Sequence, residues 1–109
     1  MPAKSFTPLE MIERLVSFDT TSRESNLQLI DFVADYLAGH GVKSTLIHDE
    51  TGKKANLVAN LGPDEDGGIM LSGHTDVVPV DGQDWHSNPF QVVRRDQRLF
   101  GRGTADMKS

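Results

Sequence analysis

Cysteine is absent from this chain of 109 residues. Disulfide bonds and thiolate metal ligands are therefore excluded, so that any metal site must use His, Asp or Glu. The sequence also lacks an apolar run long enough to span a bilayer, and residues 1–5 lack the apolar core of a secretory signal. These absences predict a cytoplasmic protein that does not associate with membranes.

Basic residues are fewer than acidic ones. Eleven Lys and Arg stand against sixteen Asp and Glu, which gives a net charge of −5. This balance argues against a surface for nucleic acid or for an anionic membrane. The densest basic group, at positions 94, 95 and 98, fits a solvated hairpin better than a binding patch. A chain of this length forms one domain or part of one, with a modest core.

Two amphipathic helices are predicted in the first forty residues. Thr7–Glu10 has the form of a capping box with proline at the first helical position, which predicts a helix over residues 8–18. Ser25 followed by Gln28 indicates a second capping box. Apolar residues then recur at helical spacing until Gly39, which we expect to end the second helix.

Strands are predicted in the remainder of the chain. Five short segments have the length and the flanking turn residues of strands: residues 42–47, 55–61, 69–72, 91–95 and 98–100. We expect residues 69–72 to be a buried strand. A short turn joins the first two strands, which favours a mixed sheet. The predicted fold class is α/β, with two amino-terminal helices packed on a mixed sheet.

A histidine and a carboxylate follow the predicted buried strand. His74 and Asp76 are two residues apart, so in an extended chain both side chains leave the same face. The carboxyl end of a strand is where α/β sheets place their chemistry. Neutral imidazole is a good metal ligand, and a carboxylate can orient it or bind beside it. Taken alone, the His-x-Asp pattern also fits surface residues in a turn.

A second carboxylate, Asp106, lies in a glycine-flanked turn near the end of the chain. It could also serve as the N-cap of a helix beginning at Met107. Together, the segments Ser72–Pro79 and Gly101–Lys108 resemble the motifs of the dinuclear zinc aminoacylase and carboxypeptidase family. The resemblance extends over nearly the whole chain.

The resemblance implies a pair of zinc ions, replaceable by cobalt, that share a carboxylate and a water molecule. By this resemblance His74 is a terminal ligand to one zinc, and Asp106 is the carboxylate that bridges both. Asp76 is the catalytic residue that accepts a hydrogen bond from the ring nitrogen of His74 that does not bind the metal. The resemblance also implies a cis peptide bond after Asp106. A structural role for His74 is the alternative. Three other histidines are assigned no metal: His40, His48 and His86.

Two further segments, Phe18–Leu27 and Asp81–Phe90, resemble the branch of the family that hydrolyses N-acetylornithine to ornithine and acetate in arginine biosynthesis. Alternatives are a related zinc deacylase, such as one acting on succinyl-diaminopimelate, an aminoacylase or a carboxypeptidase, and, in another class, a non-catalytic binding module. The implied partner is a small N-acyl amino acid, and the implied assembly is a homodimer. The resemblance also offers Thr20, Thr21 and Ser22 as residues that border the substrate pocket, but we interpret them as a loop between helices and not as site residues.

The resemblance concerns the amino-terminal portion of the family. Residues 1–109 are therefore expected to be the amino-terminal part of a zinc-dependent, zinc-peptidase-like catalytic domain, without its remaining part or a dimerisation domain. His74 and Asp106 are the two implied metal ligands in this segment, and the implied general base lies downstream. We therefore expect the segment by itself to be inactive.

Overall fold

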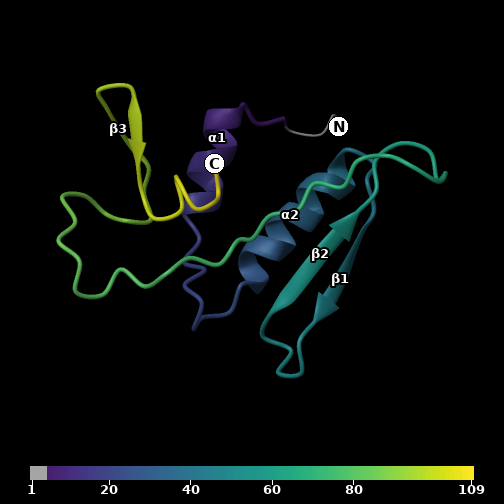
Figure 1. Ribbon diagram of the computed structural model, residues 1–109, viewed down its shortest axis with the longest axis horizontal. Helices are drawn as coiled ribbons and strands as arrows, with labels where there is room; N and C mark the ends of the chain where they lie inside the picture. The colour runs from purple at the N-terminus through teal and green to yellow at the C-terminus, as the bar shows by residue number, and fades with distance from the viewer. Residues whose placement is uncertain (1–4) are drawn as a thin grey trace. The chain divides into compact units, whose positions relative to one another are not determined.

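The computed structural model describes residues 5–109, which contain two helices and two β-hairpins (Figure 1). Residues 1–4, part of the stretch predicted not to be a secretory signal, lie outside the described residues. The chain divides into two compact units, one built on residues 26–73 and one formed by residues 6–25 together with 74–109. In residues 5–109, no helix combines the length and the apolar character needed to cross a membrane.

The unit built on residues 26–73 consists of one helix and one hairpin. Helix α2 (Leu27–Gly39) runs along strands β1 (Ser44–His48) and β2 (Ala55–Ala59) and contacts both (Figure 1). The strands pair antiparallel, from Ser44 opposite Ala59 to His48 opposite Ala55. The core of this unit consists of buried residues from the helix and from the start of β2: Leu29, Ile30 and Ala55.

The second helix ends at Gly39 as predicted, but the capping box predicted at its start is wrong. The N-cap is Asn26 rather than Ser25, and the side chain of Asn26 does not cap the helix. Its amide donates to the carbonyl of Ala55 at 2.9 Å and accepts from the N–H of Ala55 at 3.0 Å. Asn26 therefore joins the helix start to β2 by the pair of bonds that a neighbouring strand would make.

The buried strand predicted at residues 69–72 is not formed. Ile69, Met70 and Leu71 are 91, 90 and 92% exposed, and the segment pairs with no strand among the described residues. An apolar run becomes a buried strand only where neighbouring strands satisfy its backbone groups and side chains cover its faces. Residues 5–109 supply neither to this segment.

The second unit begins with helix α1 (Pro8–Val16), which ends two residues earlier than predicted. Its capping box is confirmed: the N–H of Glu10 donates to Thr7 Oγ1 at 3.2 Å, and the N–H of Thr7 donates to the Glu10 carboxylate at 3.0 Å. Val16, in the last turn, is fully buried.

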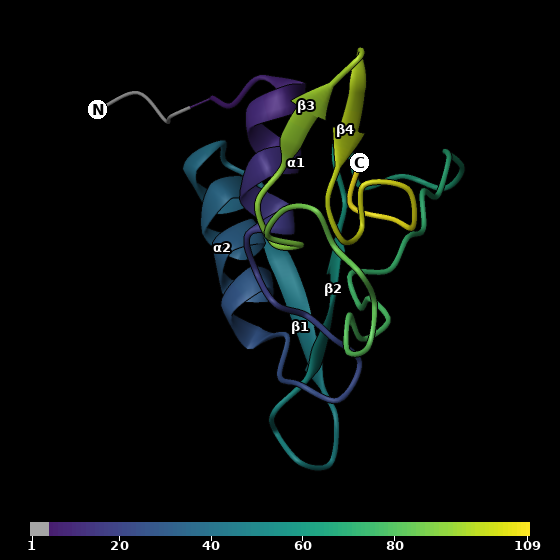
Figure 2. The same ribbon diagram turned by 90° about the vertical axis from the view of Figure 1, so that its left-hand side faces the viewer.

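The predicted hairpin near residue 96 is confirmed as strands β3 (Val93–Arg95) and β4 (Arg98–Phe100), visible in Figure 2. Both turn residues, Asp96 and Gln97, have positive φ values of 50° and 62°. This is the backbone of a type I′ turn, whose twist matches that of the strands although glutamine is not favoured at the second position.

The α/β class is confirmed by the two helices and two small sheets. Within residues 5–109 the named strands form two separate antiparallel hairpins. Parallel pairing occurs at an isolated bridge between Thr21 and Val77. The mixed strand directions thus arise from this loop contact and not from one continuous sheet.

Replacing Asn26 tests the link between α2 and β2. Asn26→Ala leaves the buried N–H and C=O of Ala55 without their partners, so we expect the free energy of unfolding to fall by about 1–3 kcal/mol. Urea denaturation measures this change. Asn56→Ala, at an exposed position one residue further along β2, is the matched control and should change the value by no more than about 0.5 kcal/mol. Equal effects of the two substitutions would contradict this role of Asn26.

The ion pair between Arg23 and Asp81 allows a test by pH. Arg23 Nη2 lies 2.8 Å from Oδ1 and 3.1 Å from Oδ2 of Asp81, and this hydrogen-bonded charge holds the pKa of Asp81 below its ordinary value of 3.8. The stabilisation is therefore present above the ordinary pKa and is lost as the pH falls through the lowered one. We expect Arg23→Gln to return the Asp81 pKa toward 3.8 in a carboxyl-carbon NMR titration. Arg94→Gln, at an exposed site in β3, should leave it unchanged, and an unmoved Asp81 pKa in Arg23→Gln would refute the assignment.

Candidate metal centre

The segment that carries His74 is held by the loop between the two helices. Thr20 Oγ1 donates to the carbonyl of Thr75 at 2.5 Å, and the N–H of Val77 donates to the carbonyl of Thr20 at 3.1 Å. The N–H of Ser22 then donates to the carbonyl of Val77 at 3.0 Å. Thr20 and Val77 are each 3% exposed. The loop thus replaces the sheet that the sequence suggested as the support of His74.

The turn that carries Asp106 is anchored to the same loop by Lys108. Lys108 is buried, and its ammonium group donates to the carbonyl of Phe18 at 2.9 Å. Burial lowers the pKa of Lys108 to about 8. The backbone N–H of Lys108 donates to the carbonyl of Gly103 at 2.6 Å. Gly103 has a φ of +99°, and a Cβ there would lie 3.1 Å from the Lys108 side chain, so glycine is required for this close approach.

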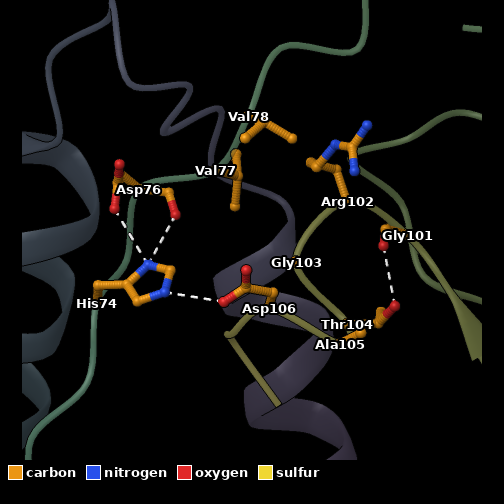
Figure 3. Close-up of a pocket in the computed structure, with 10 residues that line it drawn as sticks. All are labelled: His74, Asp76, Val77, Val78, Gly101, Arg102, Gly103, Thr104, Ala105 and Asp106. Carbon is orange, nitrogen blue, oxygen red and sulfur yellow. Dashed lines mark hydrogen bonds and ion pairs between the residues drawn. The ribbon is translucent and has the colours of Figure 1, made fainter.

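The two supports bring His74 and Asp106 together. His74 Nε2 lies 2.9 Å from Asp106 Oδ1, as predicted, although the strand expected before His74 is missing (Figure 3). The peptide bond after Asp106 is cis, as the resemblance implies. The His74 side chain is 49% exposed and that of Asp106 84% exposed. The pair is therefore accessible from solvent.

Asp76 occupies the other side of the imidazole. His74 Nδ1 lies 3.1 Å from the backbone carbonyl oxygen of Asp76 and 3.1 Å from its Oδ1. The backbone acceptor of Asp76 and then the Asp106 carboxylate raise the pKa of His74 above 6.5. Acceptors at both ring nitrogens favour the doubly protonated imidazolium, which explains why the pKa of His74 is raised.

Ser22 completes the contacts of Asp76. Its hydroxyl donates to Asp76 Oδ2 at 2.7 Å. From the sequence, Ser22 is predicted to lie in a loop and outside the metal site. One feature of the sequence could have indicated a role for Ser22, because it lies in a segment that resembles the deacetylating branch of the family. Its approach to Asp76 depends on contacts across more than fifty residues, which no local pattern reveals.

A pocket of about 230 Å³ opens beside these side chains. Its wall is formed by two segments of the second unit, residues 74–78 and 101–106 (Figure 3). Arg102 borders it with its guanidinium 5.3 Å from the ring centre of Trp85 and hydrogen-bonded to Gln83. The pocket therefore has an imidazole and two carboxylates in one part and a tethered guanidinium in another.

The donor set of this site fits a divalent metal such as zinc. With Nδ1 facing Asp76, the remaining donor of His74 is Nε2, which points at Asp106 Oδ1. Imidazole nitrogen and carboxylate oxygen are ordinary zinc ligands. Across the described residues, no three His, Asp or Glu side chains assemble into a metal-binding group. Residues 5–109 thus present two donors, fewer than the three protein ligands that a catalytic zinc usually takes.

The other histidines do not join this cluster. His40 and His48 belong to the unit built on residues 26–73. The ring of His40 lies against Tyr36 with the ring centres 4.8 Å apart. His86, in the loop after Asp81, does not line the pocket.

Comparison with known proteins gives a consistent relationship. Residues 70–109 match peptidase family M20/M25/M40. The chain is 41% identical to the acetylornithine deacetylase of Vibrio cholerae serotype O1 over 99% of its own length and 29% of the relative. The chain is 38% identical to the acetylornithine deacetylase of Pasteurella multocida, over 92% of the chain and 28% of the relative. It is 44% identical to the acetylornithine deacetylase of Edwardsiella ictaluri, over 78% of the chain and 22% of the relative.

The chain thus spans less than a third of the length of these relatives. The family match includes His74, Asp76 and Asp106, and the similarity to the deacetylases extends into the helices that precede them. Residues 70–109 are thus similar to peptidase family M20/M25/M40, and the chain is similar to acetylornithine deacetylases over nearly its whole length.

Proposed function

We propose that this chain contributes to a metal-dependent amidohydrolase that removes the acetyl group from N-acetylornithine and so serves arginine biosynthesis. The observation that carries the proposal is the 2.9 Å approach of His74 Nε2 to Asp106 Oδ1, with Asp76 behind the imidazole. The relatives named above support the choice of substrate. The proposal includes a cytoplasmic location, a homodimeric assembly and two zinc ions, which cobalt could replace.

His74 and Asp106 are the proposed metal ligands in this chain. His74 Nε2 would bind one zinc, and the two oxygens of Asp106 would bridge both. The metal pair would polarise the amide carbonyl and provide a hydroxide near neutral pH. Neutral imidazole and ionised carboxylate are the forms that bind metal. The half-exposed position of His74 leaves room for a ligand beside it.

Asp76 is proposed to act through His74. Its carboxylate and its backbone carbonyl both accept from the Nδ1 side of the ring. This contact holds the proton on Nδ1, orients the imidazole and raises its basicity as a ligand. The lone pair on Nε2 is then available at the position where Asp106 also presents an oxygen.

Residues 1–109 are proposed to form the amino-terminal part of the catalytic domain. The two donors found here would be joined by ligands and a general base from other parts of the natural gene product. A related zinc deacylase would use the same two ligands, but the identities of about 40% to acetylornithine deacetylases favour N-acetylornithine. The intact cluster of His74, Asp76 and Asp106 argues against a module that has lost catalysis.

Substitution of the two aspartates in the natural gene product separates their roles. Asp106→Ala should remove nearly all hydrolysis of N-acetylornithine and weaken the binding of both metals, because one carboxylate serves two ions. Asp76→Ala should lower turnover about 10–100-fold while lowering metal content less, because it acts through the imidazole. Turnover and metal content per chain are measured on the same samples. Wild-type turnover and metal content in Asp106→Ala would refute the bridging role.

Residues 1–109 produced alone should bind zinc weakly and hydrolyse no N-acetylornithine. Two donors fall short of a catalytic zinc site, and general-base catalysis alone is worth about 10²–10⁴-fold. Zinc calorimetry and an acetate-release assay on this segment, beside the natural gene product, test the expectation. Tight binding of two zinc ions with measurable turnover by the segment would show that further ligands and the base lie within residues 1–109.

A further inference from the structure

Ser22 contacts the one oxygen of the Asp76 carboxylate that does not face His74. Asp76 Oδ1 lies 3.1 Å from His74 Nδ1, whereas Oδ2 accepts from the Ser22 hydroxyl at 2.7 Å. The four side chains therefore form a continuous series from Ser22 through Asp76 and His74 to Asp106. The first member of this series has no role in the function proposed above.

The direction of the Ser22 hydroxyl follows from its two possible acceptors. The hydroxyl has one proton, and two oxygens within its reach are Asp76 Oδ2 at 2.7 Å and the Val77 carbonyl at 3.3 Å. A charged acceptor at the shorter distance forms the stronger bond. The carbonyl of Val77 already accepts from the backbone N–H of Ser22 at 3.0 Å. This backbone bond fixes the position from which the hydroxyl reaches the carboxylate.

The carboxylate matters because the imidazole has acceptors on both sides. A neutral histidine has one ring proton, and the position of that proton depends on which nitrogen faces the better acceptors. Asp106 Oδ1 at 2.9 Å from Nε2 draws the proton toward the nitrogen that must be free to bind a metal. Asp76 draws it toward Nδ1 through its backbone carbonyl and, while Oδ1 is turned toward the ring, through its carboxylate as well. The bond from Ser22 to Oδ2 opposes rotation of the carboxylate away from the ring.

We propose that Ser22 is a positioning residue that locks the Asp76 carboxylate toward His74 and so keeps the ring proton on Nδ1 and the Nε2 lone pair free. Ser22 acts through Asp76, and its hydroxyl is not a metal ligand in this arrangement. The proposal rests on the proposed function for its biological purpose, but the tautomer it specifies is a property of the metal-free protein.

A purely structural role of Ser22 makes a different prediction. Removing the hydroxyl leaves the backbone bond from Ser22 to Val77 in place, as well as the bonds of Thr20 to Thr75 and Val77. The loop should therefore keep its fold in Ser22→Ala. A change at His74 in a normally folded variant would consequently report the loss of the bond to Asp76.

The test uses three variants of the natural gene product: Ser22→Ala, Ser22→Thr, which keeps a hydroxyl, and Ser17→Ala. Ser17 is the matched control, because its hydroxyl donates to the carbonyl of Arg14 at 2.5 Å and not to Asp76. Long-range proton–nitrogen NMR spectra of the metal-free proteins, at a pH where His74 is neutral, report which ring nitrogen holds the proton. Circular dichroism verifies the fold, and kcat and KM are measured with zinc and N-acetylornithine.

We expect the Nδ1-protonated form to dominate in the unmodified protein, in Ser17→Ala and in Ser22→Thr. In Ser22→Ala the population should shift toward Nε2–H, and kcat should fall about ten-fold with little change in KM. An unshifted tautomer in Ser22→Ala, or an equal shift in Ser17→Ala, would overturn the proposal. A shifted tautomer in a protein that does not hydrolyse N-acetylornithine would uphold the role of Ser22 and contradict the proposed function instead.

Discussion

The arrangement of the site depends on the backbone pairing of the loop at residues 20–22 with the segment at residues 75–77. Two backbone hydrogen bonds, a bond from the Thr20 hydroxyl to the carbonyl of Thr75 and an isolated parallel bridge join them, and both threonines of the loop are buried. Without this pairing His74 and Asp76 would follow an exposed, unpaired stretch of chain. With it, two side chains on a connecting segment gain the fixed directions that a sheet normally provides.

Lys108 gives the same loop a second function. By donating to the carbonyl of Phe18 it ties the turn of Asp106 to residues that adjoin the pairing just described. Burying an ammonium group is unfavourable, as the lowered pKa of Lys108 indicates. The carbonyl oxygen offsets part of this cost because it satisfies one of the three N–H donors. One loop thus supports both sides of the contact between His74 and Asp106, and neither side depends on a continuous sheet.

The features predicted well from sequence are those encoded within a few neighbouring residues. Thr7 and Glu10 cap a helix whose start needs no distant contact, and Gly39 ends the next one. The convergence of His74 and Asp106 was predicted because their two motifs carry a family resemblance, which stands in for distant information. The His-x-Asp spacing alone favoured surface residues in a turn over a metal site.

The incorrect predictions concern features that depend on residues far apart in the sequence. Residues 69–72 have the composition of a buried strand, but burial requires neighbours that composition does not specify. Ser25 was predicted to cap the second helix, but the N-cap is Asn26, whose amide bonds to the backbone of Ala55. Ser22 was interpreted as an ordinary loop residue because its partner, Asp76, lies 54 positions away. In each case a contact between distant residues, or the lack of one, decided the outcome.

The unit that holds the site is formed by two stretches of chain, with residues 26–73 between them. In kinetic terms, Thr20 can meet Thr75 only after a loop of more than fifty residues has closed, so this contact should form later than the helix caps. The entropy of closure depends weakly on length, and doubling a flexible loop costs only about 0.6 kcal/mol. Evolution could therefore lengthen or shorten the intervening unit while the distance between the imidazole and its two carboxylates stayed the same.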